Sequence, residues 1–169
     1  MSTLLLIEDS TAIRHMVKEN LERAGIIDDI FEATSGGEGL QLLKQHNPDV
    51  VLLCLVLPDT DGLTILRTIR AIPQFRDMPV IILTGKSDVN SKIRLLDNGA
   101  SDYLVKPFDH GELIARIKVQ LKVKRLQDEL KTRSVTDYLT GLFNRRYFMS
   151  IFEKEFTRCK RYNNAMALL

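Results

Sequence analysis

Residues 49–62 read DVVLLCLVLPDTDG, and this stretch decides the class of fold. Four consecutive apolar residues, Val50–Leu53, show no polar alternation, which is typical of a strand covered by helices on both faces of a parallel sheet. Pro58 and Gly62 then predict a loop. Cys54 ends the predicted strand, where an open α/β sheet places its functional groups, so this thiol needs an explanation.

Four further strands are predicted on either side of this one, at residues 4–7, 30–33, 80–83 and 102–105. Apolar residues at helical spacing follow each strand, and a helix stop at Gly25 and an N-cap at Ser35 separate the elements. Because each parallel crossover needs a covering helix, five short strands alternating with five helices predict a doubly wound α/β fold.

The charge of the 169-residue chain is divided unevenly. Residues 1–110 carry 11 Lys or Arg and 16 Asp or Glu, whereas residues 111–169 carry 13 and 6. The basic residues of the second part fall at helical spacing among apolar ones. We therefore interpret them as a solvated helix face and expect no nucleic-acid partner.

The longest apolar runs, at 4–7 and 50–57, are too short to cross a bilayer, and no basic and apolar leader follows Met1. Cys54 and Cys159 are too few and too far apart to predict a disulfide framework or a metal cluster. We expect a cytoplasmic protein with reduced thiols and no membrane partner.

A long helix is predicted after the fifth strand. Asp109 and Glu112 have the spacing of a capping box, and neither Gly nor Pro occurs between Glu112 and Gly141. Four apolar residues in this helix form a short heptad seam: Val119, Val123, Leu126 and Leu130. We interpret the seam as a linker that pairs with its copy in a homodimer; the alternative is a helix that packs back on its own domain.

Residues 147–162 resume helical periodicity with several large apolar side chains, and residues 166–169 resemble the start of another buried strand. One incipient strand is too small a partner for such a helix. We therefore expect the chain to be part of a longer protein.

The predicted strand ends carry residues that suit phosphoryl chemistry. Glu8 and Asp9 are adjacent carboxylates, the ligand type that Mg²⁺ prefers. Thr84 offers a hydroxyl and Lys106 a positive charge for an anion. Together with Cys54 these residues describe a phosphoryl site that lacks its acceptor. Taken alone, the acidic pair is equally compatible with charges favoured at a helix start.

Four motifs at the strand ends resemble, in order, the receiver domain of two-component response regulators: Glu8-Asp9, Leu57–Gly62, Thr84-Gly85 and Gly99–Phe108. The resemblance covers roughly residues 2 to 124 and implies a flavodoxin-like parallel sheet of order 2-1-3-4-5. We assign residues 1–124 to the receiver domain and residues 110–135 to a signalling helix that overlaps its last helix.

In this family an acidic pair holds Mg²⁺, and an aspartate at the end of the third strand accepts a phosphoryl group from a histidine kinase. The resemblance implies that Glu8 and Asp9 are the metal pair. It implies that Thr84 and Lys106 sense the phosphoryl group and that Tyr103 is an aromatic switch. It also implies a cis peptide bond between Lys106 and Pro107.

Cys54 departs from the family at the acceptor itself. A thiol has an ordinary pKa of about 8.5, and two nearby carboxylates raise it further. We therefore expect Cys54 to stay neutral and unphosphorylated, and any Mg²⁺ site at Glu8 and Asp9 to be weakened. Asp59 and Asp61 are interpreted as turn residues, with a substitute acceptor as the alternative.

Three interpretations of Cys54 stay open at this point. It is a small buried apolar residue of a degenerate receiver, a redox-sensing thiol, or an introduced substitution. Only Lys106 supplies the electropositive setting that a reactive thiol needs.

Downstream, residues 137–148, DYLTGLFNRRYF, resemble the entry motif of GGDEF domains, the diguanylate cyclases that join two GTP molecules into cyclic di-GMP. The resemblance implies that residues 136–169 are the truncated start of such a domain. The family's metal-binding aspartate and its signature turn would follow Leu169, so we expect no cyclase activity from this chain. The Gly36–Gly39 run opens a receiver helix instead.

We therefore predict a degenerate receiver module that regulates a C-terminal diguanylate cyclase through dimerisation. Its predicted partners are its own copy and a histidine kinase or another signalling protein. Three alternatives are kept: a phosphorylation-independent adaptor, a redox-sensing receiver, and a conventional regulator that uses another acceptor.

Overall fold

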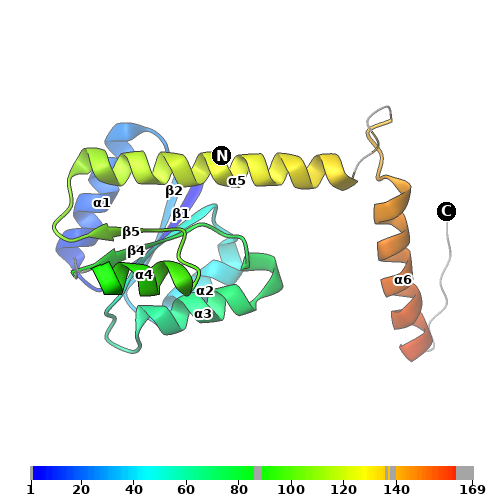
Figure 1. Ribbon diagram of the computed structural model, residues 1–169, viewed down its shortest axis with the longest axis horizontal. Helices are drawn as coiled ribbons and strands as arrows, with labels where there is room; N and C mark the ends of the chain where they lie inside the picture. Colours follow the sequence, from blue (N-terminus) through cyan, green and yellow to red (C-terminus); the bar gives the residue numbers. More distant parts are fainter. Residues whose placement is uncertain (1, 86–88, 136, 138–139, 163–169) are drawn as a thin grey trace. The chain divides into compact units, whose positions relative to one another are not determined.

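The computed structural model describes residues 2–85, 89–135, 137 and 140–162. Five parallel strands form one sheet in the order β2-β1-β3-β4-β5, which confirms the predicted fold (Figure 1). The strands are β1 (Thr3–Ile7), β2 (Asp29–Ala33), β3 (Val50–Cys54), β4 (Val80–Thr84) and β5 (Asp102–Val105).

Helices follow the strands in alternation. They are α1 (Thr11–Ala24), α2 (Gly36–His46), α3 (Gly62–Ala71), α4 (Val89–Asp97), α5 (His110–Val135) and α6 (Arg145–Tyr162), with a short 3₁₀ turn, η1, at Pro73–Phe75. The predicted start of the fourth helix near residue 87 lies outside the described residues.

The apolar residues of the strands alternate between two cores. On one face, α2, α3 and α4 cover side chains such as Leu5, Val51 and Ile82. On the other, α1 and α5 cover neighbours such as Leu6 and Leu52. Every residue of β3 is buried, so the continuous apolar run of this strand follows from cover on both sides.

The helix ends follow local chemistry. Gly25 ends α1 in the left-handed conformation, at φ +58°. The Ser35 hydroxyl caps α2 by accepting the Glu38 N–H. The predicted capping box of α5 is wrong in part: the Asp109 carboxylate accepts the Gly111 N–H at 2.6 Å, but the Glu112 carboxylate binds Arg116 instead. An ion pair with Arg116, one turn further along the helix, occupies the Glu112 side chain instead.

The chain divides into two compact units, residues 1–124 and 125–169. The first holds the sheet, and the second holds α6, along which Phe148, Phe152 and Phe156 stack at successive centroid distances of 6.0 and 5.8 Å. The strand expected at 166–169 lies outside the described residues. The domain boundaries proposed from the sequence stay predictions.

Candidate functional site

The strand ends meet at one edge of the sheet. Ile7 of β1 is in register with Leu53 of β3, and Cys54 is in register with Leu83 of β4. Because parallel strands in aligned register end together, Glu8, Cys54, Thr84 and Lys106 are brought to the same edge. The residues named from the sequence as a site are therefore neighbours.

Lys106 connects three of the four strand ends. Its ammonium group forms an ion pair with the buried Glu8 carboxylate and donates to the Cys54 Sγ at 3.3 Å. Its backbone N–H donates to the Thr84 carbonyl oxygen at 2.7 Å, and the Lys106-Pro107 peptide bond is cis, as the resemblance implied. The lysine charge is thus fixed at the centre of the edge.

Cys54 sits in a setting that keeps its thiol protonated. Its side chain is only 6% exposed, and its Sγ donates to the Val56 carbonyl oxygen at 3.0 Å. Burial raises the pKa of the Cys54 thiol, and the Glu8 carboxylate raises it further, against the opposing effect of Lys106. The net direction is upward, so the neutral thiol is the form at neutral pH.

The carboxylates of Glu8 and Asp9 and the Sγ of Cys54 place their ligand atoms within 4.8 Å of one another. Two carboxylate oxygens suit a hard cation such as Mg²⁺. A neutral thiol does not, because sulfur is a soft ligand that binds metals as the thiolate. The acidic pair therefore fits Mg²⁺, whereas the third member of the cluster does not.

The two aspartates after β3 are engaged at helix N-termini. The Asp59 carboxylate accepts the N–H groups of Gly36 and Gly37 at 2.9 Å each, which lowers the pKa of Asp59. The Asp61 carboxylate accepts the Leu63 N–H at 3.1 Å and caps α3. The interpretation of both as loop residues fits these contacts, but the binding of Asp59 to α2 was not foreseen from the sequence.

Tyr103 is half-buried beside two cations. The Lys92 Nζ lies 5.2 Å from the ring centroid, and the Arg116 guanidinium carbon lies 5.7 Å from it. Arg116 is held by Asp102, with contacts of 2.8 and 2.9 Å. These contacts fix the present position of the ring; its role as a switch stays a prediction.

The four seam residues of α5 are exposed: Val119 by 57%, Val123 by 40%, Leu126 by 49% and Leu130 by 67%. Leu113 and Ile117 on the same helix are fully buried against the sheet. Within residues 1–124, Val119 and Val123 are therefore not buried against their own domain. The pairing of the seam with a second copy stays a prediction.

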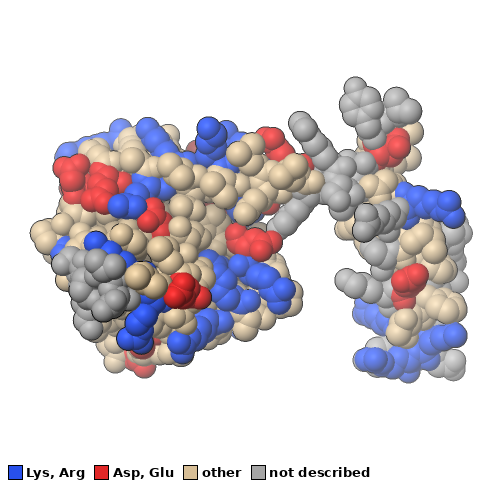
Figure 2. All heavy atoms as spheres, in the orientation of Figure 1, with Lys and Arg blue, Asp and Glu red and all other residues tan. Residues whose placement is uncertain are grey.

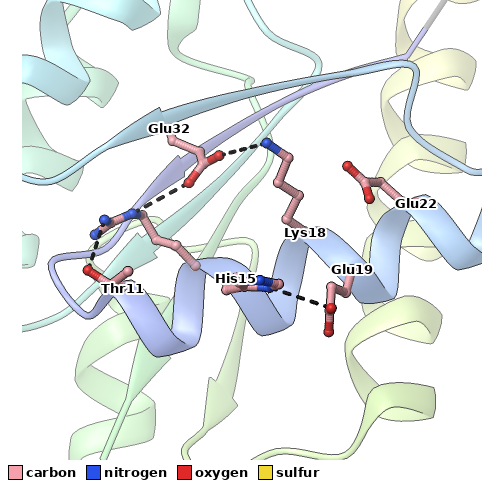
Figure 3. Close-up of a pocket in the computed structure, with 7 residues that line it drawn as sticks. Thr11, His15, Lys18, Glu19, Glu22 and Glu32 are labelled. Atoms are coloured by element: carbon pink, nitrogen blue, oxygen red, sulfur yellow. Dashed lines mark hydrogen bonds and ion pairs between the residues drawn. The ribbon is translucent and has the colours of Figure 1, made fainter.

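Sequence reasoning missed Arg14, which lies one helical turn after the acidic pair. Its Nη1 donates to the carbonyl oxygens of Glu8 and Asp9, and its Nε faces Glu32. Arg14 and Glu32 line a groove of about 410 Å³ between α1 and β2, together with Thr11, His15, Lys18, Glu19 and Glu22 (Figure 3). In the sequence, the only sign of this role is that a basic residue stands one helical turn after the acidic pair.

The carboxyl edge of this doubly wound sheet carries an acidic pair, a hydroxyl and an ammonium group, which are the groups that bind a divalent cation and an anion such as a phosphoryl group. The response regulator receiver domain model matches residues 4–118, and the chain belongs to this family. It is accordingly a receiver of two-component signalling, a family whose members bind Mg²⁺ at the acidic site, interact with histidine kinases and commonly dimerise.

Curated relatives support this assignment. The chain is 40% identical over 122 residues to the DNA-binding dual master transcriptional regulator RpaA of Synechocystis, covering 72% of this chain and 50% of that protein. It is 42% identical over 122 residues to the KDP operon transcriptional regulatory protein KdpE of Escherichia coli, covering 72% and 52%. The chain thus spans about half the length of these relatives.

Solved structures agree. A response regulator from Chloroflexus aurantiacus has a TM-score of 0.68 at 35% identity, covering 72% of this chain and 98% of that one. The receiver domain of the Francisella response regulator 1452 has a TM-score of 0.67 at 34% identity, with the same coverages. Both similarities concern the receiver part.

The surface charge and the helices can be compared with the expectation of no nucleic-acid partner and no membrane partner. Figure 2 shows acidic and basic side chains interspersed over the visible face of residues 1–124. The absence of a nucleic-acid partner stays a prediction, because RpaA is described as DNA-binding. Within the described ranges, no helix combines the length and apolarity needed to cross a bilayer.

Proposed function

We propose that this chain is a receiver that has lost aspartyl phosphorylation, with Cys54 in the phosphoacceptor position, and that it regulates a C-terminal diguanylate cyclase. The observation that carries the proposal is the setting of Cys54. Its protonated thiol lies at the end of β3, 3.3 Å from the Lys106 ammonium and beside Glu8 and Asp9. The residues that surround the phosphoacceptor in this family are present here, but the residue in the acceptor position, Cys54, has no carboxylate to accept the phosphoryl group.

Substitute acceptors have little support. Asp59 and Asp61 use their carboxylates at the N-termini of α2 and α3, where the partial positive charge of each helix stabilises them. Phosphorylation of either would remove these contacts. A conventional regulator with another acceptor is therefore the weaker alternative.

In an acceptor-competent receiver, Glu8 and Asp9 would hold Mg²⁺, which neutralises charge on a phosphoryl group. Lys106, fixed by Glu8, would place its ammonium on a phosphoryl oxygen, and Thr84 at the end of β4 would supply a hydroxyl. Because Cys54 replaces the carboxylate, we propose that switching here depends on protein contacts and not on phosphate.

A redox-sensing role for Cys54 is the second candidate, favoured by the 3.3 Å contact with Lys106. A reactive thiol needs a lowered pKa. Burial and Glu8 raise the pKa of Cys54 instead, so this candidate is the weaker one.

The proposed cyclase output rests on the resemblance of residues 137–148 to the entry motif of GGDEF domains. The Asp137 carboxylate accepts the Thr140 N–H and hydroxyl at 3.0 and 2.8 Å, and Gly141 adopts φ +69°. The Asn144 side chain accepts the Tyr147 N–H at 2.9 Å and caps α6. The described residues of the motif, 137 and 140–148, thus form a turn that leads into α6. We propose that the α5 seam brings two such domains together, which raises the effective concentration of one half-site for the other.

The test is to incubate the chain and its Cys54→Asp variant with acetyl phosphate and Mg²⁺ and to measure intact mass. The unchanged chain is expected to gain nothing, and the variant to gain one phosphoryl group. In the full-length protein, the same variant should make cyclic di-GMP synthesis responsive to the phosphodonor. A mass gain by the Cys54 chain itself would overturn the proposal, and Asp59→Asn and Asp61→Asn would then identify the acceptor.

A further inference from the structure

Arg14 on α1 binds the backbone of both residues of the acidic pair. Its Nη1 donates to the Glu8 carbonyl oxygen at 2.8 Å and to the Asp9 carbonyl oxygen at 2.9 Å. One donor group thus holds two consecutive peptide units of the β1–α1 loop. The carboxylates of the same two residues point to the edge of the sheet, within 4.8 Å of the Cys54 Sγ.

The rest of the guanidinium is anchored away from the loop. Nη2 donates to the Thr11 hydroxyl at 3.3 Å, and Nε lies 3.5 Å from the Glu32 carboxylate on β2 (Figure 3). Lys18 binds the other oxygen of Glu32 at 3.2 Å. The Arg14 side chain is only 14% exposed. Its position is therefore set by α1 and β2, and the loop is held to that frame.

We propose that Arg14 is a positioning residue that fixes the Glu8-Asp9 backbone and thereby sets the affinity of the acidic pair for a divalent cation. Arginine suits this task because its donors lie on three nitrogens of a planar fork and reach two carbonyls, a hydroxyl and a carboxylate at once, whereas the donors of lysine all lie on one nitrogen. The inference rests on the proposed function in one respect: the acidic pair must be a working metal site once a carboxylate stands at position 54.

The direction of the change in Mg²⁺ affinity distinguishes a positioning role of Arg14 from an effect of its charge. A positive charge near a cation site opposes cation binding, so the removal of charge alone should tighten Mg²⁺ binding. Loosening of the β1–α1 loop should weaken Mg²⁺ binding, because the Glu8 and Asp9 carboxylates would no longer be held together. Arg14→Lys keeps the charge and loses the fork, so only the second effect is left.

The experiment uses the full chain carrying Cys54→Asp and measures the Mg²⁺ dissociation constant by titration calorimetry. Adding Arg14→Lys is expected to weaken Mg²⁺ binding about tenfold, the lower end of what loss of a group that orients a metal ligand costs. The matched control is Lys18→Gln, which removes a positive charge and the other contact to Glu32 but touches neither carbonyl. It should leave the dissociation constant unchanged or slightly lower.

A second measurement needs no metal. In the chain with its native Cys54, Arg14→Lys should increase amide hydrogen exchange in residues 8–11 without a matching increase in β3, and Lys18→Gln should not. Equal Mg²⁺ affinity in the Arg14→Lys and parent chains, together with unchanged exchange, would overturn the inference. A Cys54→Asp parent that binds no Mg²⁺ would instead contradict the proposed function, and the exchange measurement would still decide the role of Arg14.

Discussion

At the scale of single residues, Cys54 and its neighbours set the chemistry of the edge. Lys106 and Glu8 lie 98 positions apart in sequence, and their ion pair holds the charge of the lysine beside the thiol. Since Glu8 is only 1% exposed, its carboxylate depends on this partner. The Lys106–Glu8 ion pair therefore lies beside a Cys54 side chain that is itself uncharged.

Gly62 gives a prediction at the same scale. A Cβ at this position would collide with the Cys54 carbonyl oxygen, at the end of β3, and with the Leu55 backbone that follows it. We expect Gly62→Ala to lower the free energy of unfolding by about 2 kcal/mol, in the range of overpacking substitutions. Urea denaturation measures the change.

Gly85 is the matched control, because a Cβ there meets nothing within 4 Å. Gly85→Ala should leave the urea midpoint close to that of the parent. Equal midpoints for the two variants would show that the loop after β3 relaxes without cost.

At the scale of elements, the loop after β3 is bound to α2 through Asp59. The contacts with the Gly36 and Gly37 N–H groups join segments more than 20 positions apart, and they lower the pKa of Asp59 from its ordinary value of 3.8. The charged carboxylate is the form that these groups stabilise. The α2 terminus therefore helps to hold the loop that follows Cys54.

This contact predicts a pH dependence. Because the folded-state pKa of Asp59 is lowered, its contribution to stability is present above pH 3.8 and is lost as the pH falls through the folded-state value. Urea unfolding of the parent and of Asp59→Asn should differ at neutral pH, with the parent more stable. The difference should shrink steadily below pH 4.

Subtracting the free energy of unfolding of Asp59→Asn from that of the parent cancels the contributions that other carboxyl groups make to the pH dependence of stability. One such group is Glu38, whose pKa is lowered by its bonds to Thr34. A difference that stays constant down to pH 2 would mean that the contact stabilises the fold without the charge.

At the scale of the whole molecule, α5 carries an apolar seam that is solvent-exposed in the single chain. Exposed leucines and valines at heptad spacing favour pairing with a second helix, because pairing buries their apolar surface. We expect the chain to sediment as a dimer and the Leu126→Lys, Leu130→Lys double variant to sediment as a monomer.

The control is Asp128→Asn with Glu129→Gln, which changes the net charge by the same amount on the same helix but leaves the seam intact. This variant should remain dimeric. A double-lysine variant that still sediments as a dimer would place the interface elsewhere.

The sequence by itself determined where the strands lie and where several helices begin or end, because each of these features depends on residues close in the chain. The apolar run at 50–53 predicts a buried strand, and the capping residue Ser35 and the helix stop Gly25 act within one turn. Glu8, Asp9, Thr84 and Lys106 were found because parallel strands end together. Only the tertiary structure decided which groups pair.

Local patterning does not encode that Asp59 reaches α2, that Lys106 is shared between Glu8 and Cys54, or that Arg14 holds the acidic loop to β2. Each of these contacts depends on how the twisted sheet and its covering helices bring distant segments within hydrogen-bond distance. The residue types at the carboxyl edge of the sheet indicate which chemistry is available there. The contacts between these residues are decided by the packing of the sheet and its helices.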